Sequence, residues 1–242
     1  MPTSTMQRCS FALVPGAGGD AWYWHLVAPM LEARGHEALP VDLPAADDRA
    51  GLAQYAAAVV QAIGSRDPAR VVLVAQSLGG FTAPMVCERL PISLLVLVNA
   101  MIPNPGETPG EWWGNTGHAQ AKRQQNLRDG RRGDAPFDPL VDFFHDVPKS
   151  VADSAWARGE PRQSAAVFSS PCAFTAWPRV PTRVLAGRED RFFPAEFQQR
   201  VAAERLGIAA DEMPGGHLLA LSRPTELSER LVSCAEAVLS AG

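Results

Sequence analysis

Ser77 is the residue of this chain whose setting best suits it to act as a nucleophile. It follows residues 71–74, an apolar run typical of a strand buried on both faces of a parallel sheet. Gly79 and Gly80 lack a Cβ, so a helix beginning there can pack close to the sheet, and the turn at Ser77 can be strained. Such a turn exposes the serine Oγ. A serine here can also serve only as a helix cap, so other parts of the chain must decide its role.

Partners for such a serine are present elsewhere in the chain. Serine is a weak nucleophile at neutral pH, so acyl transfer needs a histidine to take its proton and an acid to orient that histidine. His217 and Asp190 suit these roles, because each follows a predicted strand, and the carboxyl ends of parallel strands lie along one edge of a sheet. An oxyanion also needs N–H donors. We expect these to be the backbone N–H groups of Ala17, in a glycine-rich loop, and Leu78.

The elements that must position these residues alternate along the chain. Strands are predicted at residues 9–14, 37–43, 71–74, 94–98, 182–186 and 208–213. Helices are predicted at residues 22–33, 52–63, 79–90 and 194–206, and a last helix after its expected cap, Ser222. This alternation indicates an α/β fold with a doubly wound, mostly parallel six-stranded sheet.

Residues from about 103 to 178 interrupt the alternation and show no helical or strand period. The segment is too long to be a structureless loop in a compact domain, and it is rich in aromatic side chains. We therefore expect a lid inserted after the fourth strand, with an apolar substrate pocket beneath it. Trp112, Trp113 and Phe144 are the predicted pocket residues, whereas His118 and His145 are interpreted as polar lid residues.

Composition narrows the function further. The chain has 242 residues, 46% hydrophobic and 20% charged, which is typical of one folded domain spanning residues 1–242. The net charge of -4 argues against nucleic acid as a partner. The four cysteines lack metal-ligand spacing, so no metal and no other cofactor is expected. No apolar run is long enough for a membrane span or a signal peptide, so we expect a cytoplasmic protein, with no indication of its oligomeric state.

The chain resembles the α/β-hydrolases and is most similar to compact esterases related to plant methylesterases and hydroxynitrile lyases. Residues 75–79, AQSLG, match the nucleophile elbow, in which a small residue stands two before the serine and a glycine two after it. The segments PGAGGDAWYW, DLP, FHDVP, GREDRFFP and GGH fall in family order. Pro15 stands where histidine is usual, so the first loop is expected to differ in shape. The resemblance implies a Ser-His-Asp triad, an acyl-enzyme and a small hydrophobic carboxylic ester as substrate.

The resemblance also bears on which acid completes the triad. In the family pattern G-x-x-D-x-x-x-P, counted from Gly187 to Pro194, the acid is Asp190 and not its neighbour Glu189. Some relatives carry the acid after the preceding strand instead. That position is Asn99 here, and an amide cannot stabilise an imidazolium by charge.

Three other functions compete with ester hydrolysis. Residues 16–21 fit a dinucleotide-binding glycine pattern, but a short-chain reductase also needs a tyrosine four residues before a lysine. Tyr23 and Tyr55 are followed at that spacing by valines. A non-catalytic small-molecule receptor with an intact triad remains an alternative. So does a hydroxynitrile lyase, although Leu218 occupies the position where such lyases carry a lysine.

Overall fold

The computed structural model describes residues 8–239 of the chain, and in this range six parallel strands form one sheet. The strands are β1 (Ser10–Val14), β2 (Glu37–Pro40), β3 (Val71–Gln76), β4 (Leu94–Val98), β5 (Thr182–Gly187) and β6 (Asp211–Met213). Their order across the sheet is β2-β1-β3-β4-β5-β6, and every neighbouring pair is parallel. The predicted six-stranded sheet is therefore confirmed.

The inner strands match their predicted positions, but the two edge strands are shorter than predicted. Every residue of β3 and β4 is buried, as expected for strands covered on both faces. β2 ends at Pro40, beyond which the chain turns so that Leu43 N–H donates to Gly19 O at 2.8 Å. β6 begins at Asp211 instead of Ile208, because an edge strand has a ladder on one side only.

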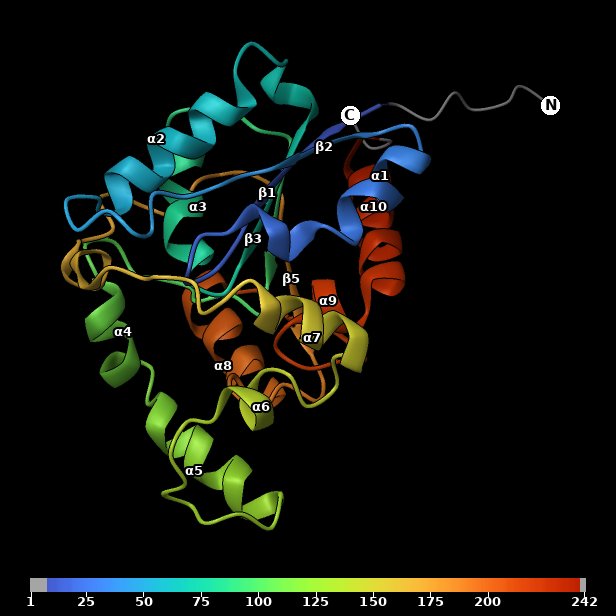
Figure 1. Ribbon diagram of the computed structural model, residues 1–242. Coiled ribbons are helices and arrows are strands. Elements are labelled where there is room, and N and C mark those ends of the chain that lie inside the picture. Colours follow the sequence, from blue (N-terminus) through green and yellow to red (C-terminus); the bar gives the residue numbers. More distant parts are fainter. Residues whose placement is uncertain (1–7, 240–242) are drawn as a thin grey trace.

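Helices cover both faces of the sheet (Figure 1). Buried side chains form two hydrophobic cores between the helices and the sheet. One face carries α2 (Leu52–Ile63), α3 (Gly79–Cys87) and α8 (Ala195–Leu206). The other carries η1 (Ala21–Trp24), α1 (Val27–Ala33), α9 (Leu219–Ser222) and α10 (Pro224–Leu239). A short 3₁₀ turn, η2 (Pro68–Arg70), leads into β3. The sheet is thus doubly wound, as predicted.

Two predicted helices are divided in the structure. The helix expected at residues 22–33 consists of η1 and α1, and Pro29 is the third residue of α1, where a helix needs no N–H donor. At the C-terminus, the prediction that Ser222 caps the last helix is wrong. Ser222 ends the short helix α9, and α10 begins at Pro224, a residue suited to the first helical position.

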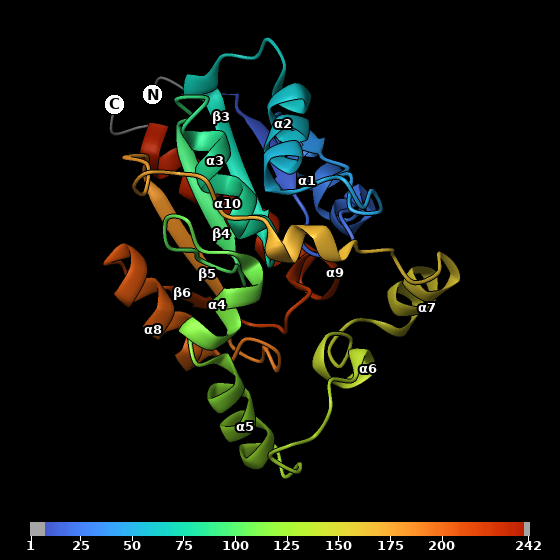
Figure 2. The ribbon, with the colours of Figure 1, turned by 90° about the vertical axis from the view of Figure 1, so that its left-hand side faces the viewer.

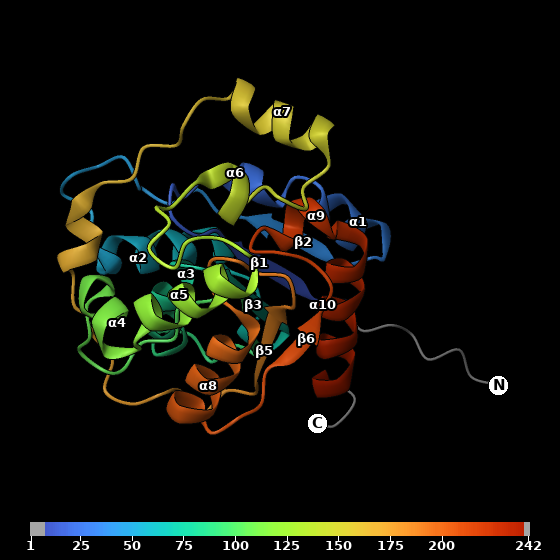
Figure 3. The ribbon, with the colours of Figure 1, turned by 90° about the horizontal axis from the view of Figure 1, so that it is seen from below.

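The chain between β4 and β5 contains helices that the sequence did not reveal. They are α4 (Pro109–Asn115), α5 (His118–Arg128), α6 (Pro139–Asp142), α7 (Lys149–Ala157) and the 3₁₀ turn η3 (Ala165–Ser169). Figure 2 shows α5, α6 and α7 standing away from the sheet, with α6 between the other two, and Figure 3 shows the same order from below. None of the helices within residues 8–239 has the length and apolar character needed to cross a membrane.

Buried ion pairs stabilise this insertion internally and join it to the rest of the domain. Glu107 pairs with Arg205 of α8, and the two side chains are 3% and 7% exposed. Asp142, which is fully buried, accepts from Lys122 Nζ at 2.5 Å and from Arg131 Nη1 at 2.9 Å. Burial alone would raise the pKa of Asp142, but the donors, led by Lys122, outweigh it and lower the pKa. Asp142 therefore remains ionised within its cluster.

Candidate active site

Ser77 lies at the junction of β3 and α3 with φ at +50°, a conformation that is strained for a serine. Its backbone O accepts from Gly80 N–H at 3.0 Å and from Met101 N–H at 2.9 Å, which holds the turn. The glycines after it are required by close packing. A Cβ on Gly80 would lie 1.9 Å from Met101 O, and one on Gly79 would lie 2.7 Å from Pro15 O.

The structure brings Ser77, His217 and Asp190 together in a chain of hydrogen bonds. His217 Nε2 lies 3.1 Å from Ser77 Oγ, and His217 Nδ1 lies 2.8 Å from Asp190 Oδ2. A carboxylate only accepts, so Nδ1 carries the proton and Nε2 is left to accept from the serine hydroxyl. All three side chains are buried. The arrangement can therefore move a proton from serine to histidine away from bulk water.

Asp190 is held by donors on both of its oxygens. Oδ1 accepts from the N–H groups of Phe192 and Phe193, both at 2.8 Å, and Oδ2 also accepts from Gln198 Nε2 at 3.3 Å. Its neighbour Glu189 turns away from the imidazole and accepts from Gly215 N–H. The residue in contact with His217 is thus Asp190, as the family pattern implies.

Asn99 supports the same loops without contacting the imidazole. It directly follows β4, has φ at +43° and is fully buried. Its Nδ2 donates to Gly216 O at 2.9 Å and to His217 O at 3.1 Å, while its Oδ1 accepts from Gly187 N–H at 2.7 Å. The amide therefore ties the loops that carry Asp190 and His217 to each other, a role that the sequence did not indicate.

The two expected oxyanion donors lie in turns beside the serine. A Cβ on Gly16 would lie 2.8 Å from Ser77 Cβ, so the glycine-rich loop approaches Ser77 closely. That loop is held by Gly19 N–H donating to Gly16 O at 3.1 Å. Within residues 8–239, the N–H groups of Ala17 and Leu78 donate to no protein acceptor. Both are thus available to a negatively charged oxygen.

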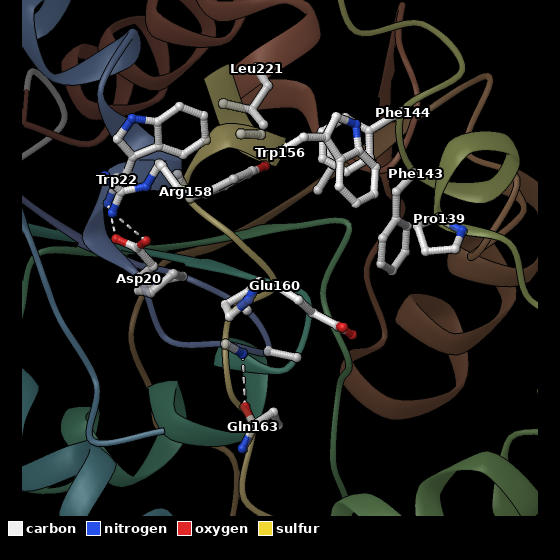
Figure 4. Close-up of a pocket in the computed structure, with 18 of the residues that line it drawn as sticks. Asp20, Trp22, Pro139, Phe143, Phe144, Trp156, Arg158, Glu160, Gln163 and Leu221 are labelled. Carbon is white, nitrogen blue, oxygen red and sulfur yellow. Dashed lines mark hydrogen bonds and ion pairs between the residues drawn. The ribbon is translucent and has the colours of Figure 1, made fainter. Parts of the chain in front are cut away.

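A cavity of about 510 Å³ opens beside these groups (Figure 4). Its walls reach the site through Ala17, Gln76 and Leu218, which are the loop donor and the chain neighbours of Ser77 and His217. The remaining lining is largely aromatic or otherwise apolar and includes Trp22, Tyr23, Phe137, Pro139, Phe143, Phe144, Trp156 and Leu221. The cavity therefore suits an apolar group of a small molecule.

Only one of the three predicted pocket residues lines this cavity. Phe144 does, but Trp112 is fully buried in the core, and its Nε1–H donates to Ile102 O at 3.0 Å. Trp113 packs edge-on against His118, with ring centroids 4.8 Å apart. The prediction for these two tryptophans is corrected, because an aromatic count does not indicate which way a side chain points.

His118 is also more buried than a polar lid residue should be. Its Nε2–H donates to Phe192 O at 2.7 Å, and burial lowers the pKa of this imidazole. It is therefore a neutral member of the aromatic packing beside Asp190.

Polar groups at the cavity come from residues that the sequence did not single out. Arg158 Nη2 donates to Asp20 Oδ2 at 2.7 Å, and the same guanidinium lies 5.2 Å from the centre of the Trp22 ring. Figure 4 shows this group across the cavity from Phe143. Tyr23 OH accepts from Ala220 N–H at 3.3 Å, and burial raises the pKa of this phenol, which stays protonated.

Comparisons with known proteins agree with this geometry. The model of the alpha/beta hydrolase family matches residues 11–230. Norfluorocurarine synthase 1 from Strychnos sp is 25% identical, over 96% of this chain and 97% of that protein. Methylesterase 3 from Arabidopsis thaliana is 38% identical over 112 residues, which are 42% of this chain and 43% of that protein. The crystal structure of polyneuridine aldehyde esterase has the same fold, with a TM-score of 0.74 at 23% identity, covering 94% of this chain and 99% of that one.

Proposed function

The chain belongs to the alpha/beta hydrolase family, and we propose that it is a carboxylic ester hydrolase that forms an acyl-enzyme on Ser77. The observation that carries the proposal is the hydrogen-bond chain from Ser77 Oγ through His217 to Asp190, with distances of 3.1 and 2.8 Å. The esterases named among its relatives support hydrolysis of an ester.

Acylation begins when Ser77 Oγ attacks the ester carbonyl carbon and His217 Nε2 takes the hydroxyl proton. Asp190 stabilises the imidazolium that forms and keeps its ring oriented. The former carbonyl oxygen becomes an oxyanion, for which the N–H groups of Ala17 and Leu78 are the donors. The tetrahedral intermediate then collapses, the bond to the alcohol oxygen breaks, and His217 gives the departing alkoxide its proton.

Deacylation repeats the same proton transfers with water. His217 removes a proton from a water molecule that attacks the acyl carbon, and the proton then returns to Ser77 Oγ as the acid leaves. Asp190 stays ionised throughout. The reaction needs no group beyond those of the chain and one water molecule.

The cavity supports a small hydrophobic ester as the substrate. Its volume of about 510 Å³ is in the range of small-molecule sites, and Phe143, Phe144 and Trp156 give it aromatic walls. All three side chains come from the insertion between β4 and β5. In the proposed function this insertion is a lid that selects the substrate, while the loops after the strands perform the chemistry.

A labelling experiment tests the proposal. Wild-type protein is expected to react with a fluorophosphonate probe and to hydrolyse members of a panel of chromogenic esters of graded acyl length. Ser77→Ala should abolish both reactions while its thermal unfolding remains cooperative. Ser154→Ala, on the exposed face of α7, is the matched control and should keep both. Labelling that persists in Ser77→Ala excludes Ser77 as the nucleophile.

A further inference from the structure

The loop between β6 and α9, residues 214–218, carries His217, whose backbone O accepts from Gln76 Nε2 at 3.4 Å. Side chains from three further parts of the chain also hold this loop. Asn99 donates to the carbonyl oxygens of Gly216 and His217, and Glu189 accepts from Gly215 N–H. The third contact comes from the insertion. Asp146 Oδ2 accepts from Gly216 N–H at 2.7 Å. The backbone of His217 and of the two residues before it is therefore held by hydrogen bonds that do not involve the imidazole.

Asp146 lies so close to this loop that a side chain at position 216 would collide with it. A Cβ on Gly216 would lie 2.7 Å from Asp146 Oδ1 and 2.7 Å from His145 Cε1. Asp146 and Gly216 are 70 residues apart in sequence. The contact thus joins the insertion to the residue directly before His217, and it depends on a residue without a side chain at position 216.

The chain around Asp146 is itself anchored on both sides. On one side, Asp142 is fixed by Lys122 and Arg131 and also accepts from Asp138 N–H at 2.9 Å. On the other side, Val147 packs in the core that contains α9 and α10, and its N–H donates to Phe144 O at 3.1 Å. Asp146 lies between these two anchored residues, so its carboxylate can hold the loop that it contacts.

We infer that Asp146 is a positioning residue for ester hydrolysis, which keeps His217 in line with Ser77 and Asp190 through the Gly216 N–H. The inference rests on the proposed function. Its physical basis is that a charge-assisted hydrogen bond is stronger than a neutral one, and that a small misplacement of a catalytic group greatly slows the reaction. The insertion then does more than shape the cavity, because it also sets the position of the base.

Substitutions at position 146 test this role. Asp146→Ala removes the acceptor, so kcat should fall about 10- to 100-fold while KM changes less than about twofold. Asp146→Asn keeps an oxygen that can accept from Gly216 N–H and should restore most of kcat. Asp153→Ala, which removes an exposed carboxylate of α7, is the matched control and should match wild type. A wild-type kcat in Asp146→Ala, or a change confined to KM, overturns the inference.

A readout that needs no turnover separates this inference from the proposed function. The Nδ1 proton of His217, donated to Asp190, is followed by NMR at low field in wild type and variants. Its signal should weaken or vanish in Asp146→Ala and persist in Asp146→Asn. If wild type hydrolyses no ester but the signal follows this pattern, the proposed function fails and the positioning role stands. An unchanged signal in folded Asp146→Ala refutes the role, and Asp146→Ser is read in the same way if the alanine variant does not fold.

Discussion

The imidazole of His217 lies nearly parallel to the phenyl ring of Phe143, with ring centroids 4.8 Å apart and planes 15° from parallel. Phe193 meets the same imidazole edge-on, with centroids 5.0 Å apart at 90°. The face of a phenyl ring carries partial negative charge, which favours a cation above it. Phe143 also lines the cavity, and in the proposed reaction its ring would lie against His217 when the imidazole takes up a proton.

Phe143→Leu should lower kcat/KM by up to about 30-fold, because a cation–π contact with a desolvated cation contributes about 2 kcal/mol and His217 is 1% exposed. Phe137→Leu is the control, since Phe137 lines the cavity but packs on Phe143, with centroids 4.9 Å apart. The comparison uses a short acetate ester that makes little use of the cavity. Equal losses in both variants would show that the effect is one of packing alone.

Asp190→Asn should reduce turnover by about 10⁴, because an amide gives His217 neither the charge nor the single orientation that the carboxylate provides. Glu189→Gln should have a small effect, since the amide oxygen can still accept from Gly215 N–H. Steady-state kinetics on one ester compares the two variants directly. A larger loss of turnover in Glu189→Gln than in Asp190→Asn would assign the orienting role to Glu189 instead of Asp190.

Trp156→Ala should change the ranking of esters by acyl length and leave the rate on a small acetate ester nearly unaltered, because Trp156 lines the cavity and is 44% exposed. Trp112→Ala should instead lower the free energy of unfolding by about 3–5 kcal/mol, since its side chain is fully buried. Urea denaturation and the ester panel measure the two effects. Uniform loss across the panel in Trp156→Ala would contradict a role in selection.

Glu37 should make the stability of the domain depend on pH in acid. Hydrogen bonds from Arg66 and then Ser10 lower the pKa of Glu37 from 4.5 to about 2. The unfolded chain therefore takes up this proton first as the pH falls. The ion pair of Glu37 with Arg66 contributes fully to the free energy of unfolding above about pH 4.5. This contribution is lost between about pH 4.5 and about pH 2.

Urea denaturation of wild type and Glu37→Gln at several pH values measures this contribution. The difference in free energy of unfolding should be largest at pH 6 and should shrink as the pH falls below 4.5. Glu196→Gln is the control, because its ion pair with Arg128 is well exposed and contributes little. A difference for Glu37→Gln that stays constant with pH would show that the pair acts through packing.

Ester hydrolysis should be measurable, whereas cleavage of the cyanohydrin mandelonitrile should not exceed background on the same preparation. A departing cyanide needs a cation in a site of low dielectric, and Leu218, directly after His217, gives the cavity an apolar side chain there. The two lysines of the chain are engaged elsewhere, Lys122 with Asp142 and Lys149 with Asp153. Arg158 lines the cavity, but its charge is paired with Asp20. Faster cleavage of mandelonitrile than of every ester in the panel would overturn this prediction.

The sequence predicted the inner strands because they are buried on both faces and read as continuous apolar runs. Ser77, Asp190 and His217 each follow a strand closely, so the geometry of a parallel sheet was enough to bring them together. The ends of the edge strands were harder to predict. β2 and β6 pair on one side only, so each ends where the chain turns away from its single neighbour.

The insertion could not be predicted in the same way. α5 reads HAQAKRQQNLR, and two of its buried positions are His118 and Asn126, so it shows no apolar stripe of helical period. Its buried His118 instead donates to Phe192 O, a partner 74 residues away in sequence. For the same reason nothing local marks Asp146, whose contact with Gly216 exists only once the chain has folded.

The crowding at Gly80 has a consequence for how substitutions at the elbow would be tolerated. A Cβ there would meet the backbone oxygen of Met101 at 1.9 Å, and a backbone atom cannot move aside as a side chain can. In a saturation library at position 80, only the protein with glycine should therefore accumulate in soluble form. At position 77, variants with other small residues should also accumulate as soluble protein, but none of them should be active. Two neighbouring positions of the elbow would thus separate selection for folding from selection for chemistry.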